Sequence, residues 1–148
     1  GDIESTINVL GAQIRKMLDD RFEILKSMKN IAVIGFSPDA SKDSFKVGNF
    51  LINRGYNVFA VYPRSFKIAN KQSVKNINDI SASIDTAVVF RKSEALNEVF
   101  DEIMQKGVKN LWLQLGIKND EIAKKARENG LNFTQDACVM IELLNKDK

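Results

Sequence analysis

The sequence predicts an α/β protein: a Rossmann-like, three-layer domain with a mostly parallel sheet of about five strands. Short apolar runs of strand length alternate with amphipathic helical patterns along the chain. The runs are apolar at consecutive positions, which is typical of parallel strands covered on both faces. The length of 148 residues is that of one ordinary domain, so we expect one core and one main site.

Five strands are predicted from runs rich in β-branched and aromatic residues, each bounded by residues that favour turns. They cover residues 31–34, 57–61, 86–90, 110–113 and 131–134. Because parallel strands run in the same direction, their carboxyl ends are expected at one edge of the sheet. Ligands of open α/β sheets bind at that edge.

Three helices are predicted between these strands, at residues 44–54, 95–106 and 119–129. The second shows the clearest amphipathic spacing, with these apolar residues three or four positions apart: Leu96, Val99, Phe100, Ile103 and Met104. In the third, Asn119 is the expected N-cap. A glycine that favours helix termination follows each of the three: Gly55, Gly107 and Gly130.

Residues 1–28 precede this alternation and are predicted to form an N-terminal helical extension, with residues 29–148 as the ligand-binding domain. Apolar residues recur there at steps of three and four, and the pattern fails only at Arg21. They are Ile3, Ile7, Leu10, Ile14, Met17, Ile24 and Met28. The stripe spans fewer than four heptads. It either packs on the core of its own chain or forms a homodimer or larger assembly.

The amino-acid composition limits the kinds of catalytic and metal-binding sites that the chain can form. The chain has no histidine, the commonest general base and metal ligand, and we predict neither a catalytic constellation nor a metal site. Cys138 is the only cysteine, so no internal disulfide forms, which suits a reducing compartment. No apolar run reaches the roughly 20 residues of a membrane span, and the N-terminus lacks a basic signal region. We expect a cytoplasmic protein without a membrane partner.

The net charge of +3 is too small to indicate a nucleic-acid partner. The charge is unevenly distributed, because the segment from Lys42 to Lys75 holds seven basic residues and one acidic residue. Such a segment is either a solvated face or the binding region of a phosphorylated ligand.

The loop after the first strand has features of a phosphate site. Gly35 allows a ligand to approach the backbone, and the following helix offers free N–H groups at its N-terminus. Hydroxyls at Ser37, Ser41 and Ser44, and the charge of Lys42, add further phosphate partners. Alternatively, Ser41 or Ser44 only caps the helix and Gly35 only turns the chain.

Standard nucleotide motifs are absent. There is no GxxxxGK[ST], and Ser37 replaces the second glycine of GxGxxG. Where a classical NAD site has an acid at the end of the second strand, this chain has Arg64. Arginine pairs with a phosphorylated ribose, which favours NADP or another phosphoribosyl adenosine over NAD.

A set of loop motifs resembles a known family, the small stand-alone CoA-binding proteins. These are similar to the nucleotide-binding domain of the succinyl-CoA synthetase alpha subunit. The resemblance covers about residues 18–143. It is carried by Gly35-x-Ser37 with Lys42 and Ser44, Pro63, Phe90-Arg91-Lys92-Ser93-Glu94, Leu111-Trp112-Leu113-Gln114-Leu115-Gly116 and Asp136-Ala137-Cys138.

The resemblance implies a domain that binds coenzyme A or an acyl-CoA. The pyrophosphate is expected near Gly35, Ser37 and Ser44, and phosphates, including the 3′-phosphate, near Lys42 and Arg64. Pro63, Phe90 and Arg91 are expected to line the adenosine and pyrophosphate edge. Gln114 and Gly116 are expected to flank the pantetheine arm. Three neighbours in the same loops complete the expected cofactor-binding set: Phe36, Tyr62 and Lys92.

Two positions depart from the family pattern. Tyr62 stands where the family often has asparagine, and its ring either stacks on an adenine or crowds it. Ala69-Asn70 replaces a usual glycine, and a loop that cannot readily take positive φ is expected to sit differently, although asparagine tolerates positive φ better than most residues. Trp112 is expected in the core, and Cys138 is expected to be a small buried apolar residue rather than a nucleophile.

The leading hypothesis is therefore a non-catalytic CoA or acyl-CoA binding protein, acting as a carrier, sensor or accessory protein. An NADP-linked reductase is the alternative, with Tyr56 and Tyr62 as the only tyrosine proton donors. A third hypothesis is an assembly module that uses the N-terminal stripe and keeps a vestigial nucleotide pocket.

Overall fold

A computed structural model describes residues 2–148, apart from the side chains of residues 11–18 and 93. In chain order the elements are α1 (Asp2–Leu18), α2 (Arg21–Ser27), β1 (Asn30–Ile34), α3 (Asp43–Asn53), β2 (Asn57–Val61), β3 (Lys67–Ile68), β4 (Lys71–Gln72), η1 (Ile77–Asp79), β5 (Thr86–Val89), η2 (Ser93–Ala95), α4 (Leu96–Lys106), β6 (Asn110–Leu113), α5 (Asp120–Glu128), β7 (Asn132–Thr134) and α6 (Val139–Lys146).

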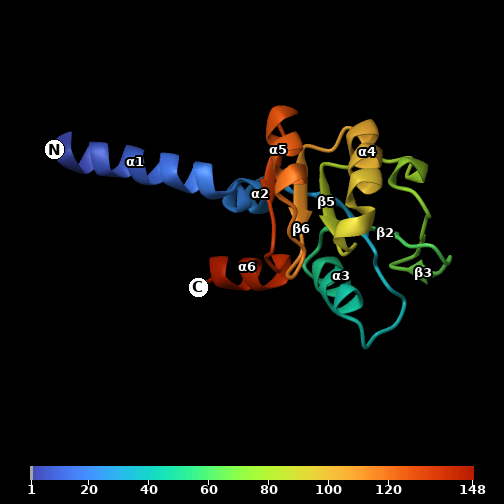
Figure 1. The fold of residues 1–148 in the computed structure, drawn as a ribbon. Helices are drawn as coiled ribbons and strands as arrows, with labels where there is room; N and C mark the ends of the chain where they lie inside the picture. The colour runs from blue at the N-terminus through green and yellow to red at the C-terminus, as the bar shows by residue number, and fades with distance from the viewer. Residues whose placement is uncertain (1) are drawn as a thin grey trace.

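The main sheet has five parallel strands in the order β2-β1-β5-β6-β7, as the sequence predicts. Helices α4 and α5 cover one face, where Leu111 and Leu113 of β6 belong to their apolar cluster. Helices α2, α3 and α6 cover the other face, with Trp112 in their cluster. The three layers are visible in Figure 1. Trp112 is fully buried, and its indole N–H donates to the carbonyl of Ala137 at 2.8 Å.

The predicted helices α3, α4 and α5 form within one residue of their expected limits at either end, and capping residues explain the start of α5 and the end of α4. The side chain of Asn119 accepts a hydrogen bond from the N–H of Ile122 at the start of α5, as expected of an N-cap. Gly107 ends α4 with φ 81°, a left-handed conformation that favours glycine. The sequence did not indicate helix α6 or the β3–β4 hairpin.

The β3–β4 hairpin turns at Ala69 and Asn70, with φ 53° and 62°. Two successive residues with positive φ are typical of a type I′ hairpin turn. The turn therefore adopts positive φ without a glycine, and Asn70 is of a residue type that tolerates this conformation better than most. Ala69 adopts a conformation that costs a residue with a β-carbon about 1–2 kcal/mol.

The N-terminal apolar stripe divides at Asp19 and Asp20, between the two helices. In α2, Ile24 is fully buried and packs in the core, so this half packs on its own chain as the first alternative predicted. Helix α1 instead projects away from the domain (Figure 1), and Ile3, Ile7 and Leu10 are 77%, 61% and 51% exposed. The alternative that the stripe packs on the core of its own chain is therefore wrong for Ile3, Ile7 and Leu10. Ile14 and Met17 lie outside the described side chains.

The acidic pair between α1 and α2 fixes α2 to the domain. The N–H of Asp20 donates to the carbonyl of Phe133 in β7, and the N–H of Phe133 donates to the carboxylate of Asp20, both at 3.0 Å. Arg21 bridges Asp19 and Glu142 of α6 at 2.6 and 3.0 Å. None of the described helices is both long and apolar enough to cross a membrane.

Candidate functional site

The strand order reverses between β1 and β5, so a crevice is expected at their carboxyl ends. Gly35 follows β1 and Phe90 follows β5. A β-carbon built on Gly35 would lie 3.2 Å from that of Phe90, and Gly35 has φ 91°. Glycine at this position therefore permits both the turn and the close approach of the two loops.

The loop from Gly35 to Ser44 is shaped by its own hydroxyls. The N–H of Ser37 donates to Oγ of Ser44 at 3.0 Å, and Oγ of Ser37 accepts from the N–H of Asp39 at 3.1 Å. Ser41 bonds to the Asp39 carboxylate through both its N–H and its hydroxyl. These hydrogen bonds, first that of the Ser41 N–H, hold the pKa of Asp39 below its usual range.

The alternative that Ser41 or Ser44 caps the following helix is wrong. The N-cap of α3 is Lys42, whose side chain makes no capping hydrogen bond. The first turn of α3 therefore has no side-chain acceptor at its N-terminal end, while Asp43 places a negative charge there. Lys42 itself is exposed.

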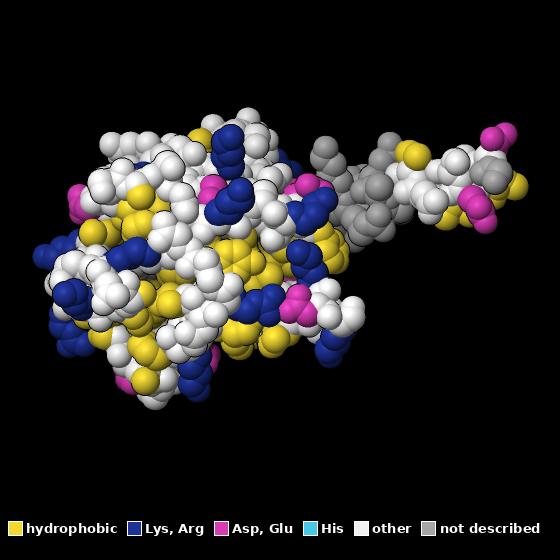
Figure 2. Space-filling view, turned by 180° about the vertical axis from the view of Figure 1, so that it is seen from behind, with side chains coloured by type: hydrophobic (Ala, Val, Ile, Leu, Met, Phe, Trp, Pro, Cys, Tyr) yellow, Lys and Arg dark blue, Asp and Glu magenta, His cyan; other side chains and the backbone are white. Residues whose placement is uncertain are grey.

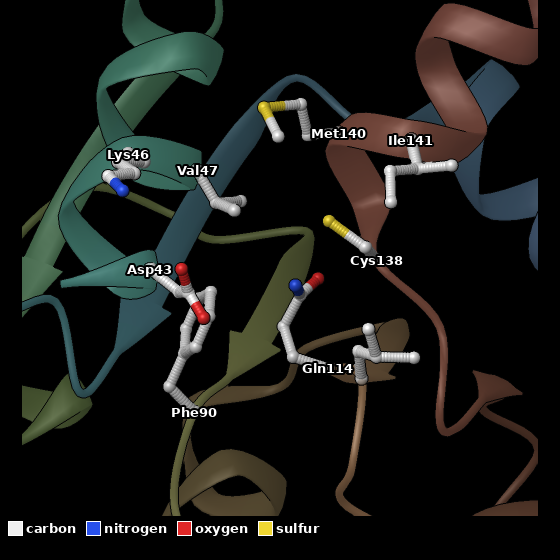
Figure 3. A pocket seen from close by; sticks show the side chains of 9 residues that line it. Asp43, Lys46, Val47, Phe90, Gln114, Cys138, Met140 and Ile141 are labelled. Atoms are coloured by element: carbon white, nitrogen blue, oxygen red, sulfur yellow. The ribbon is translucent and has the colours of Figure 1, made fainter.

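One cavity lies between α3, the ends of β5 and β6, and α6, and we call it the apolar cavity (Figure 3). Its volume is about 270 Å³. It is lined by Asp43, Lys46, Val47, Phe90, Gln114, Leu115, Cys138, Met140 and Ile141. Five of these nine side chains are hydrocarbon or thioether groups, so the cavity suits a flexible, weakly polar chain.

Gln114 anchors the α6 side of this cavity. It is only 2% exposed, and its Oε1 accepts a hydrogen bond from the N–H of Val139, the first residue of α6, at 2.9 Å. The neighbouring Gly116 lies outside the cavity lining and donates its N–H to Asp136 at 2.8 Å. The two residues expected beside a pantetheine arm thus also join the β6–α5 loop to the segment that precedes α6.

A second cavity of about 390 Å³ lies on the other side of Gly35, and we call it the charged cavity. It is lined by Ile34, Gly35, Val61, Tyr62, Pro63, Lys75, Arg91, Ala95, Glu98, Val99 and Glu102. Burial, together with repulsion from Glu98 and Asp79, raises the pKa of Glu102, and Arg91 opposes that increase. The cavity therefore has two cationic and two acidic side chains in its lining.

The structure brings together only part of the site set predicted from the sequence. Gly35, Tyr62, Pro63 and Arg91 line the charged cavity, and Phe90 and Gln114 line the apolar cavity. Seven residues line neither of these two cavities: Phe36, Ser37, Lys42, Ser44, Arg64, Lys92 and Gly116.

The residues outside the cavities differ in what they do. Phe36 is fully buried under Gly48, so its ring is a core group and only its backbone is available to a ligand. Ser37 and Ser44 fix the loop. Arg64 and Lys92 are exposed, and basic side chains are spread over the face of the domain seen in Figure 2.

Sequence reasoning missed several lining residues. Glu98 and Glu102 are one helical turn apart on α4, on either side of Val99, a spacing that places all three toward one side of the helix. The sequence indicates Lys46 and Lys75 only as members of the basic segment from Lys42 to Lys75. Cys138, expected to be a small buried apolar residue, is half-buried, packs against the core cluster of α2, α3 and α6, and lines the apolar cavity.

Comparisons with known proteins agree with this arrangement. The model of a family described as CoA binding domain matches residues 29–143, which include the whole sheet and the lining of both cavities. The uncharacterized protein YneT of Bacillus subtilis (strain 168) is 30% identical over 119 residues, which are 80% of this chain and 88% of YneT.

Solved structures show the same fold. A hypothetical protein from Pyrococcus horikoshii OT3 is 32% identical with a TM-score of 0.79, over 85% of this chain and 89% of that one. The protein cell-free ID.343 from Thermus thermophilus is 30% identical with a TM-score of 0.79, over 83% of this chain and 93% of that one. A dinucleotide forming acetyl-coenzyme A synthetase 1 from Ca. Korarchaeum cryptofilum, at 21% identity and a TM-score of 0.67, shares the fold over 77% of this chain and 27% of its own.

Proposed function

This chain belongs to the CoA binding domain family, and we propose that it binds coenzyme A or an acyl-CoA in the crevice between β1 and β5 without converting it. The observation that carries the proposal is the pair of unlike cavities on the two sides of the Gly35–Phe90 contact. CoA has two unlike halves: a nucleotide with three phosphate groups, and a long pantetheine arm that ends in a thiol.

The charged cavity suits the nucleotide half. Lys75 and Arg91 supply cations that can pair with phosphate, and Arg91 can do so through two parallel hydrogen bonds. Glu98 and Glu102 supply acceptors for the amino and hydroxyl groups of an adenosine. Tyr62 offers a half-buried ring that already contacts Phe66 edge-on, at 5.9 Å between ring centres.

The apolar cavity suits the pantetheine half. Val47, Phe90 and Met140 offer apolar contact, while the carboxamide of Gln114 can hydrogen-bond to one of the amides of the arm. A ligand that spans both cavities passes from Gly35, which lines the charged cavity, to Phe90, which lines the apolar cavity.

We propose binding rather than catalysis because of where the reactive end of an acyl-CoA would lie. Its thioester would occupy the apolar cavity, whose lining contains a single carboxylate, Asp43, and the chain has no histidine. A carrier, sensor or accessory role fits a cavity in which five of the nine lining side chains are hydrocarbon or thioether groups.

Thermal unfolding of the purified protein with CoA, dephospho-CoA, NADP or NAD tests the proposal. CoA at 100 times its Kd should stabilise the fold by about 2.7 kcal/mol, and dephospho-CoA less because it lacks the 3′-phosphate. The absence of stabilisation by millimolar CoA would refute CoA binding. A larger shift with NADP, together with hydride transfer, would support the reductase alternative instead.

A further inference from the structure

Large apolar side chains are exposed at the mouth of the apolar cavity. Leu115 and Ile141 both line this cavity, yet they are 65% and 47% exposed. Outside α1, only two other large apolar side chains of the described residues are exposed, Phe22 and Leu144. The apolar wall of the cavity therefore continues onto the surface, and exposed apolar surface of this kind is typical of a ligand-binding groove.

This apolar surface follows α6 away from the cavity. Leu144 is 45% exposed and lies three residues after Ile141 and four after Met140, so the three side chains share one flank of α6. In Figure 3, Met140 of α6 and Val47 of α3 point toward the space between their two helices. The exposed apolar flank of α6 therefore begins beside α3.

Helix α3 supplies the facing side. Phe50 lies three residues after Val47, and Arg54 four residues after Phe50, so these positions share one side of the helix. The guanidinium of Arg54 lies 5.4 Å from the ring centre of Phe50 and pairs with Asp147 at 2.7 Å. This ion pair joins the carboxyl-terminal ends of α3 and α6. Since a helix rises about 1.5 Å per residue, it lies about 10 Å beyond Met140.

Four apolar side chains lie between the cavity and this ion pair, and we call them the apolar strip: Phe50, Met140, Ile141 and Leu144. We propose that the apolar strip binds the hydrocarbon chain of an acyl-CoA, so that the protein prefers a medium-chain acyl-CoA to free CoA. This inference rests on the proposed function, because the thioester must lie in the apolar cavity for the chain to reach the strip.

The covalent structure of an acyl-CoA determines what lies on the strip. Its acyl chain begins at the sulfur that ends the pantetheine arm, so the chain starts inside the apolar cavity. The cavity volume of about 270 Å³ is below the roughly 300–1,000 Å³ of pockets that enclose small molecules. With the pantetheine arm inside, a chain of several carbons must leave through the mouth, where Leu115 and Ile141 are exposed.

The strip also suits an uncharged chain of limited length. Its members carry no charge, and the two charged groups at its far end, Arg54 and Asp147, neutralise each other. An extended octanoyl chain has about the length of the strip. A longer chain would pass the ion pair and gain no further apolar contact from the strip.

The test measures the Kd of the full chain for CoA, butyryl-CoA, octanoyl-CoA and palmitoyl-CoA by isothermal titration calorimetry, below the micelle concentration of each ligand. We expect octanoyl-CoA to bind at least about 10-fold more tightly than butyryl-CoA. Each fully buried methylene contributes about a factor of 4, and a strip on the surface buries the chain only in part. Palmitoyl-CoA should bind little more tightly than octanoyl-CoA. Octanoate without CoA should not bind measurably.

Two matched variants locate the chain. Leu144→Ser should reduce the preference for octanoyl-CoA over CoA by at least about 3-fold, and should leave the Kd of CoA unchanged because Leu144 lines neither cavity. Phe22→Ser is the control and should leave the preference unchanged. Phe22 is 53% exposed on α2, which joins α6 through Arg21 and Glu142, on the other flank from Leu144.

Equal Kd values for CoA, butyryl-CoA and octanoyl-CoA would overturn the proposal, as would a preference for octanoyl-CoA that Leu144→Ser leaves intact. If chain length has no effect and Leu144→Ser lowers the sedimenting mass, a second copy of this chain covers the strip instead. In each of these cases, binding of CoA itself would leave the proposed function standing. If neither CoA nor any acyl-CoA binds, the proposed function is wrong as well.

Discussion

Gly48 lies in α3 directly above the ring of Phe36. A β-carbon at this position would lie 2.2 Å from Cε2 of that ring, and Phe36 is fully buried. The ring also has neighbours at 6.0 Å and 5.9 Å between centres, Phe45 and Phe66, which restrict its movement. The helix can therefore approach the sheet only if position 48 has no side chain.

We expect Gly48→Ala to lower the free energy of unfolding by about 1–3 kcal/mol, because the methyl group overpacks the core. Denaturant unfolding measures the change. Adding Phe36→Leu to the same chain should recover part of the loss, since leucine lacks the ring that the methyl group meets. An alanine variant as stable as the original protein would contradict this account of the contact.

At Ala69, in contrast to Gly48, we expect a substitution to stabilise the protein. Its φ of 53° disfavours any residue with a β-carbon, whereas glycine adopts it readily. We expect Ala69→Gly to raise the free energy of unfolding by about 1 kcal/mol. Ala40→Gly is the control, because Ala40 lies in an exposed loop without positive φ and its replacement should destabilise slightly. Equal effects of the two substitutions would argue against the strained turn.

Arg91 and Lys92 are adjacent cations with different surroundings, since only Arg91 lines the charged cavity. We expect Arg91→Ala to weaken CoA binding by about 10- to 100-fold, the loss of one or two charge-assisted hydrogen bonds. Lys92→Ala should change the Kd by less than about 3-fold, as should Arg127→Ala on α5. Isothermal titration calorimetry measures the Kd of each variant. A larger loss of affinity in Lys92→Ala than in Arg91→Ala would place the phosphates outside this cavity.

At the scale of elements, the junction of α1 and α2 is held by a charged cluster. Burial, the largest single influence, would raise the pKa of Asp19, but hydrogen bonds from Arg21 and Thr134 and the charge of Arg21 outweigh it. The pKa of Asp19 therefore lies below its usual value of 3.8 in the folded protein. A carboxyl group with a lowered pKa stabilises the fold above its unfolded pKa, and this contribution is lost as pH falls through the folded pKa.

We expect Asp19→Asn to reduce the free energy of unfolding by about 1–2 kcal/mol at neutral pH, and the difference from the unsubstituted protein to shrink below about pH 4. Urea unfolding between pH 3 and pH 7 measures both. Asp101→Asn, at an exposed position on α4, is the matched control and should have little effect at any of these pH values. A pH-independent loss at Asp19 would show that its charge is not the stabilising feature.

The elements also show how far sequence reasoning reaches. The strands β1, β2, β5 and β6 were predictable because each is a continuous apolar run with a turn beyond it. The β3–β4 hairpin was not predictable. Each of its strands has only two residues, which is too short to show a periodic pattern, and its turn lacks glycine. Helix α6 was missed because its N-cap, Cys138, makes no side-chain capping bond and is not a typical capping residue.

The position of the crevice was predictable from the strands alone. Parallel strands bring Gly35, Phe90 and Gln114 to one edge of the sheet, whatever the conformation of the loops that follow. The direction in which each loop side chain points could not be predicted from the sequence. Whether Arg64 or Lys75 faces the cavity depends on backbone angles and on contacts between distant segments, and neighbouring loop residues such as Arg91 and Lys92 point to different surroundings.

At the scale of the whole molecule, α1 is the feature that the domain does not explain. It projects from the domain with Ile3, Ile7, Val9 and Leu10 exposed, and apolar side chains are visible on its far end in Figure 2. An isolated helix of 17 residues is only marginally stable in water, so packing is needed to keep it formed. We propose that a second copy of this chain supplies that packing through its own α1.

The expected result is a homodimer whose mass falls to that of the monomer when Ile7 is replaced by glutamate, because the substitution places a charge in the apolar stripe. Sedimentation velocity at micromolar concentration measures the mass. Ser5→Glu is the matched control, since Ser5 lies on the opposite side of α1 and its replacement should leave the dimer intact. CoA binding should persist in both variants, because the cavities lie in residues 34–141. An unsubstituted protein that sediments as a monomer would contradict the dimer, and loss of CoA binding in the Ile7→Glu variant alone would show that assembly completes the site.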